Sequence, residues 1–288
     1  MQDCPPESGG QRDREADPAR GGSKAETYNM ASEILLTNDD GIHSPGLTAL
    51  EESLAPLGNV VIVAPDREMS ATSHRISLHQ PLRYEQTGSK RYSVEGSPAD
   101  CVILACLRIL KQRPALVISG VNRGWNLGDD INYSGTVSAA FEAALQGIPA
   151  IAVSTFATEN TDFVAAARVT SRLARSVLEH GLPPDVVLNV NFPQKWNGSV
   201  RLTRQGRQAT QGVLVQSRDP RGREYFWLDE KIARTNGEAA SSPAHTLMTD
   251  FGAVAAGFVS VSPLHLDRTA HAHVERFTDW LDGLEWSE

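Results

Sequence analysis

Residues 34–41 of this 288-residue chain read ILLTNDDG, an apolar run of strand character that ends in two adjacent carboxylates and a glycine. In an open parallel sheet, ligands bind beyond the carboxyl ends of the strands. Two neighbouring acids repel each other there and lose hydration, unless a cation or a proton lies between them. We therefore expect a hard divalent metal at Asp39 and Asp40. An ordinary turn is the alternative interpretation of this motif taken alone, because Asn, Asp and Gly are common turn residues.

Strand and helix patterns alternate along the chain from residue 32 onward. Four further runs have the apolar, β-branched composition of buried parallel strands: 60–64, 115–119, 148–154 and 186–191. Helices are predicted between the strands and after them: 45–57, 98–110, 137–145 and 162–180. This repeated β-α-β order predicts an α/β fold, with a doubly wound, Rossmann-like and mostly parallel sheet.

Three regions depart from this order. Residues 1–29 are rich in Gly, Pro, Ser, Ala and charge, so we expect a disordered tail ahead of one domain at 30–288. Residues 200–245 contain short strand-like runs around an Asp-Pro-Arg-Gly turn, which predicts a C-terminal β-hairpin excursion. Strand character is expected again at 250–262, followed by a final amphipathic helix at 272–284.

Composition narrows the class of protein. A net charge of −8 argues against a nucleic-acid polymer as partner, since such partners favour basic surfaces. The apolar runs are far shorter than the roughly 18 residues of a membrane helix, and no secretory segment opens the chain. Three cysteines form neither a metal-type pair nor an even disulfide set. We expect a cytoplasmic protein without a membrane partner.

Further oxygen ligands follow other predicted strand ends. The loop after residues 60–64 carries the hydroxyls of Ser70, Thr72 and Ser73, and the strand at 115–119 leads to the amide of Asn122. Two carboxylates, a hydroxyl and an amide suit Mg²⁺ or Mn²⁺ and select against zinc and copper. When each loop is taken alone, a polar turn or a cap is the favoured interpretation.

A glycine-flanked hydroxyl pair opens the helix predicted from residue 137. Residues 126–137 read NLGDDINYSGTV. Free backbone N–H groups and the positive end of the helix dipole make Ser134, Gly135 and Thr136 a candidate phosphate site. Asn126 is a candidate for binding phosphate or sugar. The alternative is a simple N-cap by Ser134 or Thr136. Neither a dinucleotide fingerprint nor a P-loop is present.

The order of these segments closely resembles the SurE family of survival-protein nucleotidases. The segments that carry the resemblance are 34–41, 63–67, 97–102, 119–122, 126–137 and 257–264. The resemblance covers about residues 32–275. The family often has Arg or Gln before the ligand serine and Gly after it, where this chain has Met69 and Ala71.

The resemblance implies a metal-dependent phosphomonoesterase that acts on nucleoside 5′- and 3′-monophosphates, and in some members on short polyphosphate. It implies one Mg²⁺ or Mn²⁺ per subunit, held by residues matching Asp39, Asp40, Ser70 and Asn122. It also implies a homodimer or homotetramer in which the 200–245 region packs or exchanges between subunits.

No histidine lies in an obvious general-base position, so we expect the metal to activate water while Asp39 or Asp40 orients it or accepts its proton. These two acids are therefore the expected catalytic residues. The alternative function is a non-catalytic module that senses nucleotide or phosphate. Metal-dependent release of phosphate separates the two.

Overall fold

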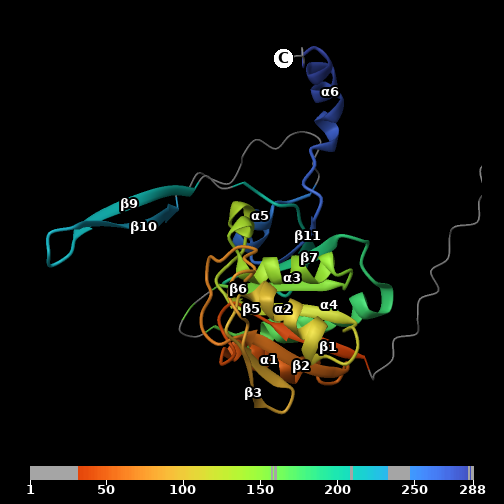
Figure 1. Ribbon diagram of the computed structural model, residues 1–288. Coiled ribbons are helices and arrows are strands. Elements are labelled where there is room, and N and C mark those ends of the chain that lie inside the picture. Colours follow the sequence, from red (N-terminus) through yellow and green to blue (C-terminus); the bar gives the residue numbers. More distant parts are fainter. Residues whose placement is uncertain are drawn as a thin grey trace, which may run out of the picture.

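The computed structural model describes residues 32–156, 158, 161–207, 210–232, 247–284 and 286 (Figure 1). The expected tail at 1–29 and part of the 200–245 region lie outside these residues. The main sheet consists of β1 (Glu33–Thr37), β2 (Asn59–Pro65), β3 (Tyr84–Gly88), β4 (Arg91–Val94), β5 (Leu116–Arg123), β6 (Ala150–Thr155), β7 (Val186–Phe192), β8 (Val200–Leu202) and β11 (Val259–His265). The order across this sheet is β3-β4-β2-β1-β5-β6-β7-β11-β8.

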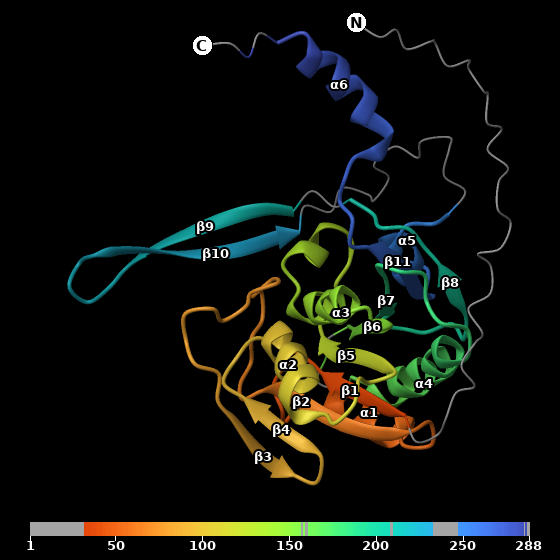
Figure 2. The ribbon, with the colours of Figure 1, turned by 45° about the vertical axis from the view of Figure 1, so that its right-hand side comes forward.

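Helices cover both faces of the sheet (Figure 2). They are α1 (Pro45–Leu54), α2 (Pro98–Leu104), α3 (Gly135–Leu145), α4 (Phe163–His180) and α5 (Asp250–Ala255), with short helical turns η1 (Ala105–Ile109) and η2 (Gly128–Asn132). The turn η3 (His271–His273) leads into α6 (Val274–Asp282), which extends away from the sheet (Figures 1 and 2). The chain is therefore a doubly wound α/β protein with a mostly parallel sheet, as predicted. Among the described residues, no helix combines the length and the apolar character that crossing a bilayer requires.

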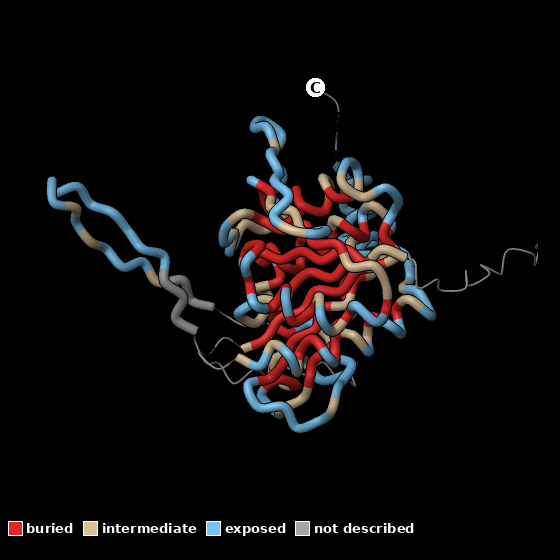
Figure 3. The backbone as a smooth tube through the Cα atoms, turned by 90° about the horizontal axis from the view of Figure 1, so that it is seen from below, coloured by how far each residue is buried: buried red, intermediate tan, exposed pale blue. Residues whose placement is uncertain are grey.

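The alternating side chains of β1 divide the core into two halves. Ile34 and Leu36 pack with α1 and α4 on one face. Leu35 points to the other face, where it packs with residues of α2 and α3. This period of two is what a strand buried on both faces requires. Figure 3 shows the result, with buried central strands surrounded by exposed loops and helix surfaces.

The direction of winding reverses at β1. This strand lies between β2 and β5, and both run parallel to it. The chain leaves β1 toward β2 on one side and returns to β5 on the other. Doubly wound proteins bind their ligands beyond the carboxyl ends of the strands at such a switch point, and we call this region beyond β1 and β5 the switch-point crevice.

The predicted hairpin excursion is present. Strands β9 (Thr210–Arg218) and β10 (Glu224–Ile232) form a separate antiparallel pair that extends away from the main sheet (Figures 1 and 2). The Asp219 carboxylate closes the turn, because it accepts from the backbone N–H groups of Arg221 and Arg223 at 2.9 Å each.

The strand expected at 250–262 is only partly correct. Residues 250–255 form α5, and strand structure begins at Val259. The Thr249 hydroxyl caps this helix by accepting from the Gly252 N–H at 3.1 Å. Short apolar runs do not distinguish a buried strand from a buried helix by periodicity, which explains the error.

Candidate active site

The ILLTNDDG segment ends in a tight turn that Asn38 closes. The Asn38 amide donates to the Gly41 carbonyl at 3.0 Å and accepts from the Gly41 N–H at 3.2 Å. Gly41 has a φ of +94°, a region that a residue with a side chain adopts only with strain. The turn interpretation and the ligand interpretation are thus compatible, since the turn places Asp39 and Asp40 at the switch-point crevice.

The start of α3 holds the Asp39 carboxylate. Thr136 donates to Asp39 Oδ1 through its hydroxyl at 2.5 Å and to Oδ2 through its backbone N–H at 3.2 Å. A Cβ at Gly135 would lie 3.0 Å from Asp39 Oδ2, so glycine permits this close approach. Asp39 is only 4% exposed. Burial raises the pKa of Asp39, and the two bonds from Thr136 act in the opposite direction.

The Asp40 carboxylate lies against the end of β5. Its Oδ2 accepts from the Arg123 N–H at 3.1 Å. Burial, followed by the charge of Asp39, raises the pKa of Asp40 to about 6. A divalent cation between the two carboxylates would offset both the lost hydration and their mutual repulsion.

The loop after β2 packs directly on this turn. The Met69 N–H donates to the Asp39 carbonyl at 2.7 Å, which brings Ser70 to the same crevice. The Ser70 hydroxyl donates to the Glu68 carboxylate at 2.8 Å. The charge of Glu68 also raises the pKa values of Asp39 and Asp40, as a minor cause. Glu68 was not among the predicted site residues, although its place two residues before the expected ligand serine was a usable signal.

The other two candidate hydroxyls of this loop make backbone contacts. Thr72 donates to the Met69 carbonyl at 2.9 Å, and Ser73 donates to the Asn132 carbonyl at 2.7 Å. His74 lies 2.9 Å from the Glu142 carboxylate on α3, a contact that lowers the pKa of Glu142. These bonds tie the loop to α3 and its approach, so Ser70 is held close to Asp39.

Asn122 reaches the crevice from β5. The register of β5 against β6 shifts between Ser119 and Asn122, and bulges of this kind often lie next to active sites. The Asn122 amide nitrogen donates to the Gly124 carbonyl at 3.0 Å. That bond does not use the amide oxygen, which is the atom that a hard cation binds.

The donors suit a hard cation by their chemistry. Asp39, Asp40, Ser70 and Asn122 lie on segments that are directly bonded to one another around the crevice. Among the described residues, no group of three or more His, Cys, Asp or Glu side chains could hold a metal ion. A cation here would therefore depend on the hydroxyl and the amide as well as the two carboxylates. That ligand set stays a prediction.

The predicted phosphate-binding residues have structural partners as well. The Ser134 hydroxyl caps α3 by accepting from the Val137 N–H at 3.1 Å. The Asn126 amide donates to the Ser154 hydroxyl at 2.7 Å, and the Asn126 N–H donates to Asn191 Oδ1 at 2.9 Å. Asn126 is therefore fixed against β6 and β7. The role of these residues toward phosphate stays a prediction.

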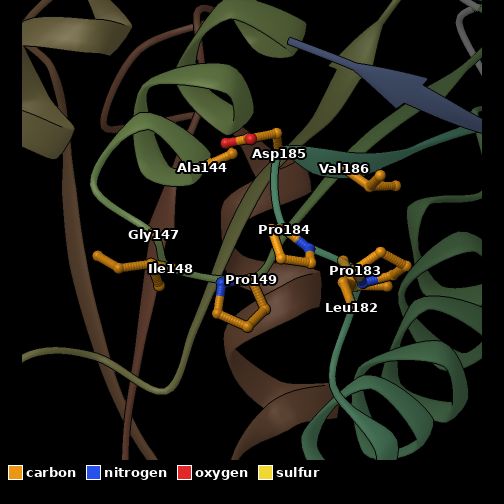
Figure 4. Close-up of a pocket in the computed structure, with 9 residues that line it drawn as sticks. All are labelled: Ala144, Gly147, Ile148, Pro149, Leu182, Pro183, Pro184, Asp185 and Val186. Atoms are coloured by element: carbon orange, nitrogen blue, oxygen red, sulfur yellow. The ribbon is translucent and has the colours of Figure 1, made fainter. Parts of the chain in front are cut away.

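A separate cavity of about 230 Å³ lies at the opposite end of the sheet (Figure 4). It is lined by Pro149, Pro183, Pro184 and Asp185, just before β6 and β7 begin. Strands β6 and β7 have six and seven residues, and a strand rises roughly 3.3 Å per residue, so the cavity lies about 20 Å from the switch-point crevice. This cavity is not part of the candidate active site.

Known proteins match this chain over most of its length. The family model described as "Survival protein SurE" matches residues 34–212. The protein named 5′-nucleotidase SurE of Citrifermentans bemidjiense is 49% identical over 251 residues, which is 86% of this chain and 98% of the relative. The protein of the same name from Geotalea daltonii is 46% identical over 254 residues, with the same coverage of both chains.

A solved structure also matches. The crystal structure of the SurE protein from Aquifex aeolicus superposes with a TM-score of 0.75 at 41% identity. The match covers 87% of this chain and 99% of that chain. The family model, the relatives and the solved structure agree with one another, and this chain belongs to the SurE family.

Proposed function

We propose that this chain hydrolyses nucleoside 5′-monophosphates to nucleoside and phosphate with the help of one divalent cation, Mg²⁺ or Mn²⁺. The relatives that match it over nearly their whole length are named 5′-nucleotidases, and the chain is a nucleotidase of that family. The observation that carries the metal dependence is the pair of neighbouring acids at the switch point, Asp39 and Asp40. The pKa of each of these two carboxyl groups is raised.

Asp39, Asp40, Ser70 and Asn122 would hold the cation. When bound, it supplies neutralisation of the charge on the phosphoryl group and lowers the pKa of a water molecule. Both oxygens of Asp39 already accept bonds from Thr136, whereas the bond to Asp40 uses Oδ2. We therefore assign orientation of the attacking water and acceptance of its proton to Asp40, and a fixed ligand role to Asp39.

The start of α3 would bind the phosphate. The Ser134 hydroxyl accepts from the Val137 N–H, and its own proton can still be donated to a phosphate oxygen. The backbone of Gly135 and Thr136 adds the positive end of the helix dipole, which favours an anion. Asn126, whose amide donates to Ser154 on β6, is assigned to the phosphate or the sugar.

We propose three finer assignments as well. We include nucleoside 3′-monophosphates and short polyphosphate as substrates, residues 30–288 as the catalytic domain, and the cytoplasm as the compartment. A homodimer or homotetramer would use the β9–β10 hairpin. Large apolar side chains exposed on it support this assembly: Leu214, Phe226, Trp227 and Leu228.

Phosphate release from AMP, measured with Mg²⁺, with Mn²⁺ and with EDTA, tests the function. We expect turnover with either metal and none with EDTA. Asp39→Asn is expected to remove most of the activity while the protein stays folded by circular dichroism. Undiminished turnover in EDTA would exclude the metal role. Tight metal-dependent binding of AMP without phosphate release would favour the sensing module instead.

A further inference from the structure

A cavity of about 220 Å³ lies beyond the carboxyl ends of β6 and β7, at the same edge of the sheet as the crevice. Phe156 and Trp196 contribute aromatic rings to its lining. The Phe156 ring packs on Trp125, with ring centroids 4.7 Å apart and planes inclined at 48°. Trp125 is fixed in turn, since its indole N–H donates to the Phe192 carbonyl at 2.6 Å. The Phe156 ring, which lines the cavity, is therefore held in place by its packing on Trp125.

Strand register shows how close this cavity is to the reacting phosphate. Thr155, at the end of β6, pairs with Arg123 on β5 and with Phe192 on β7. The Arg123 N–H donates directly to Asp40. Neighbouring strands lie about 4.8 Å apart, so the space between β6 and β7 is roughly 12 Å from β1. The phosphate, ribose and base of one nucleotide, laid end to end, span a comparable distance.

The lining also indicates which part of a nucleotide would bind there. Flat aromatic faces stack on any base. Gln194 lines the cavity and carries a donor and an acceptor on one amide, which suits the polar edge of any base. Asp162 lines the cavity as well, and its carboxylate caps α4 by accepting from the Ala165 N–H at 2.9 Å. A negative group here disfavours a phosphate, so a neutral ring is the better occupant.

We propose that Phe156 and Trp196 bind the nucleobase of the substrate by stacking. The cavity then selects nucleotides over phosphate esters that lack a base, and it discriminates little between one base and another. This inference rests on the proposed function, because it requires the phosphate of a nucleotide to lie at Asp39 and Asp40.

The test compares KM for AMP with KM for ribose 5-phosphate, which has the sugar and phosphate but no base. Trp196→Ala and Phe156→Ala are expected to raise KM for AMP between about fivefold and a hundredfold, the range for loss of one base stack. KM for ribose 5-phosphate should stay within twofold, and kcat for AMP should change little. Trp196→Phe keeps an aromatic face and should restore most of the affinity.

Two further variants serve as controls. Tyr84→Ala removes an aromatic ring that is 42% exposed, against 39% for Trp196, at the far edge of the sheet, and it should leave both KM values unchanged. Phe156→Leu keeps an apolar side chain against Trp125, so it separates lost stacking from lost packing. If Trp196→Ala and Phe156→Ala raise KM equally for both substrates, or for neither, the assignment is overturned.

Binding of adenosine in EDTA, measured by calorimetry, separates this inference from the proposed function. If the wild-type protein released phosphate from neither ester, the proposed function would fail while adenosine binding still tested the cavity. Weaker binding of adenosine to Trp196→Ala than to the wild type supports the base site. Equal affinities, or no binding to the wild type, overturn it.

Discussion

Thr136→Val would remove one hydrogen-bond donor from Asp39 with little change of volume at the start of α3. The Thr136 hydroxyl donates to Asp39 Oδ1 at 2.5 Å, and both residues are buried. A hydrogen bond to a charged group contributes about 1.5–3 kcal/mol, which equals roughly a 10- to 150-fold change in an equilibrium constant. We expect the Kd for Mn²⁺ to rise about 10- to 100-fold, the usual effect of losing a residue that orients a metal ligand.

Isothermal titration of Mn²⁺ into wild-type and variant protein measures this change. Thr170→Val is a matched control, because Thr170 is equally buried and its hydroxyl bonds to the Ala166 carbonyl within α4, at 2.8 Å. The control should keep the wild-type Kd, and saturating Mn²⁺ should recover much of the lost turnover in Thr136→Val. A Kd within twofold of the wild-type value would refute the orienting role of Thr136.

Three other predictions concern the same region. Gly135→Ala places a Cβ 3.0 Å from the Asp39 carboxylate; because Asp39 must then shift, we expect weaker Mn²⁺ binding with an unchanged circular dichroism spectrum. The pKa of Asp40 is raised to about 6, so between about pH 4 and pH 6 the unfolded chain binds fewer protons than the folded chain, and metal-free stability falls as the pH rises. Urea denaturation in EDTA should show this slope for the wild type and a flatter one for Asp40→Asn, whereas equal slopes would contradict it. Asp250→Ala removes the acceptor of three backbone N–H groups, those of Gly128, Gly206 and Phe251, and should lower the free energy of unfolding by about 3 kcal/mol; an unaltered Tm would argue against this.

The central strands could be predicted from the sequence because their composition allows little else. The runs in β2, β5, β6 and β7 are apolar and β-branched, as strands buried on both faces must be. By contrast, β3 reads YEQTG and is mostly exposed, so it carries no hydrophobic period and was not predicted. Strand β8 was expected with the hairpin but pairs with β11 in the main sheet.

The candidate site was predictable to the extent that it follows strand ends. Asp39, Asp40 and Asn122 each come directly after, or at the end of, an apolar strand, and the switch point brings those ends together. The bond from Thr136 to Asp39 joins residues 97 positions apart. Sequence spacing says nothing about which atoms meet over that distance, so Thr136 was assigned to phosphate alone.

Because the first turn of α3 holds Asp39, a predicted cation ligand, and also faces the expected phosphate, we expect the binding of cation and phosphate to be coupled. A cation that shifts Asp39 would also move the backbone N–H groups of that turn. An anion bound to those N–H groups would in turn hold Asp39 in place. Thermodynamic reciprocity then requires each ligand to tighten the other by the same factor. Inorganic phosphate should therefore lower the Kd for Mn²⁺ by the same factor by which Mn²⁺ lowers the Kd for phosphate.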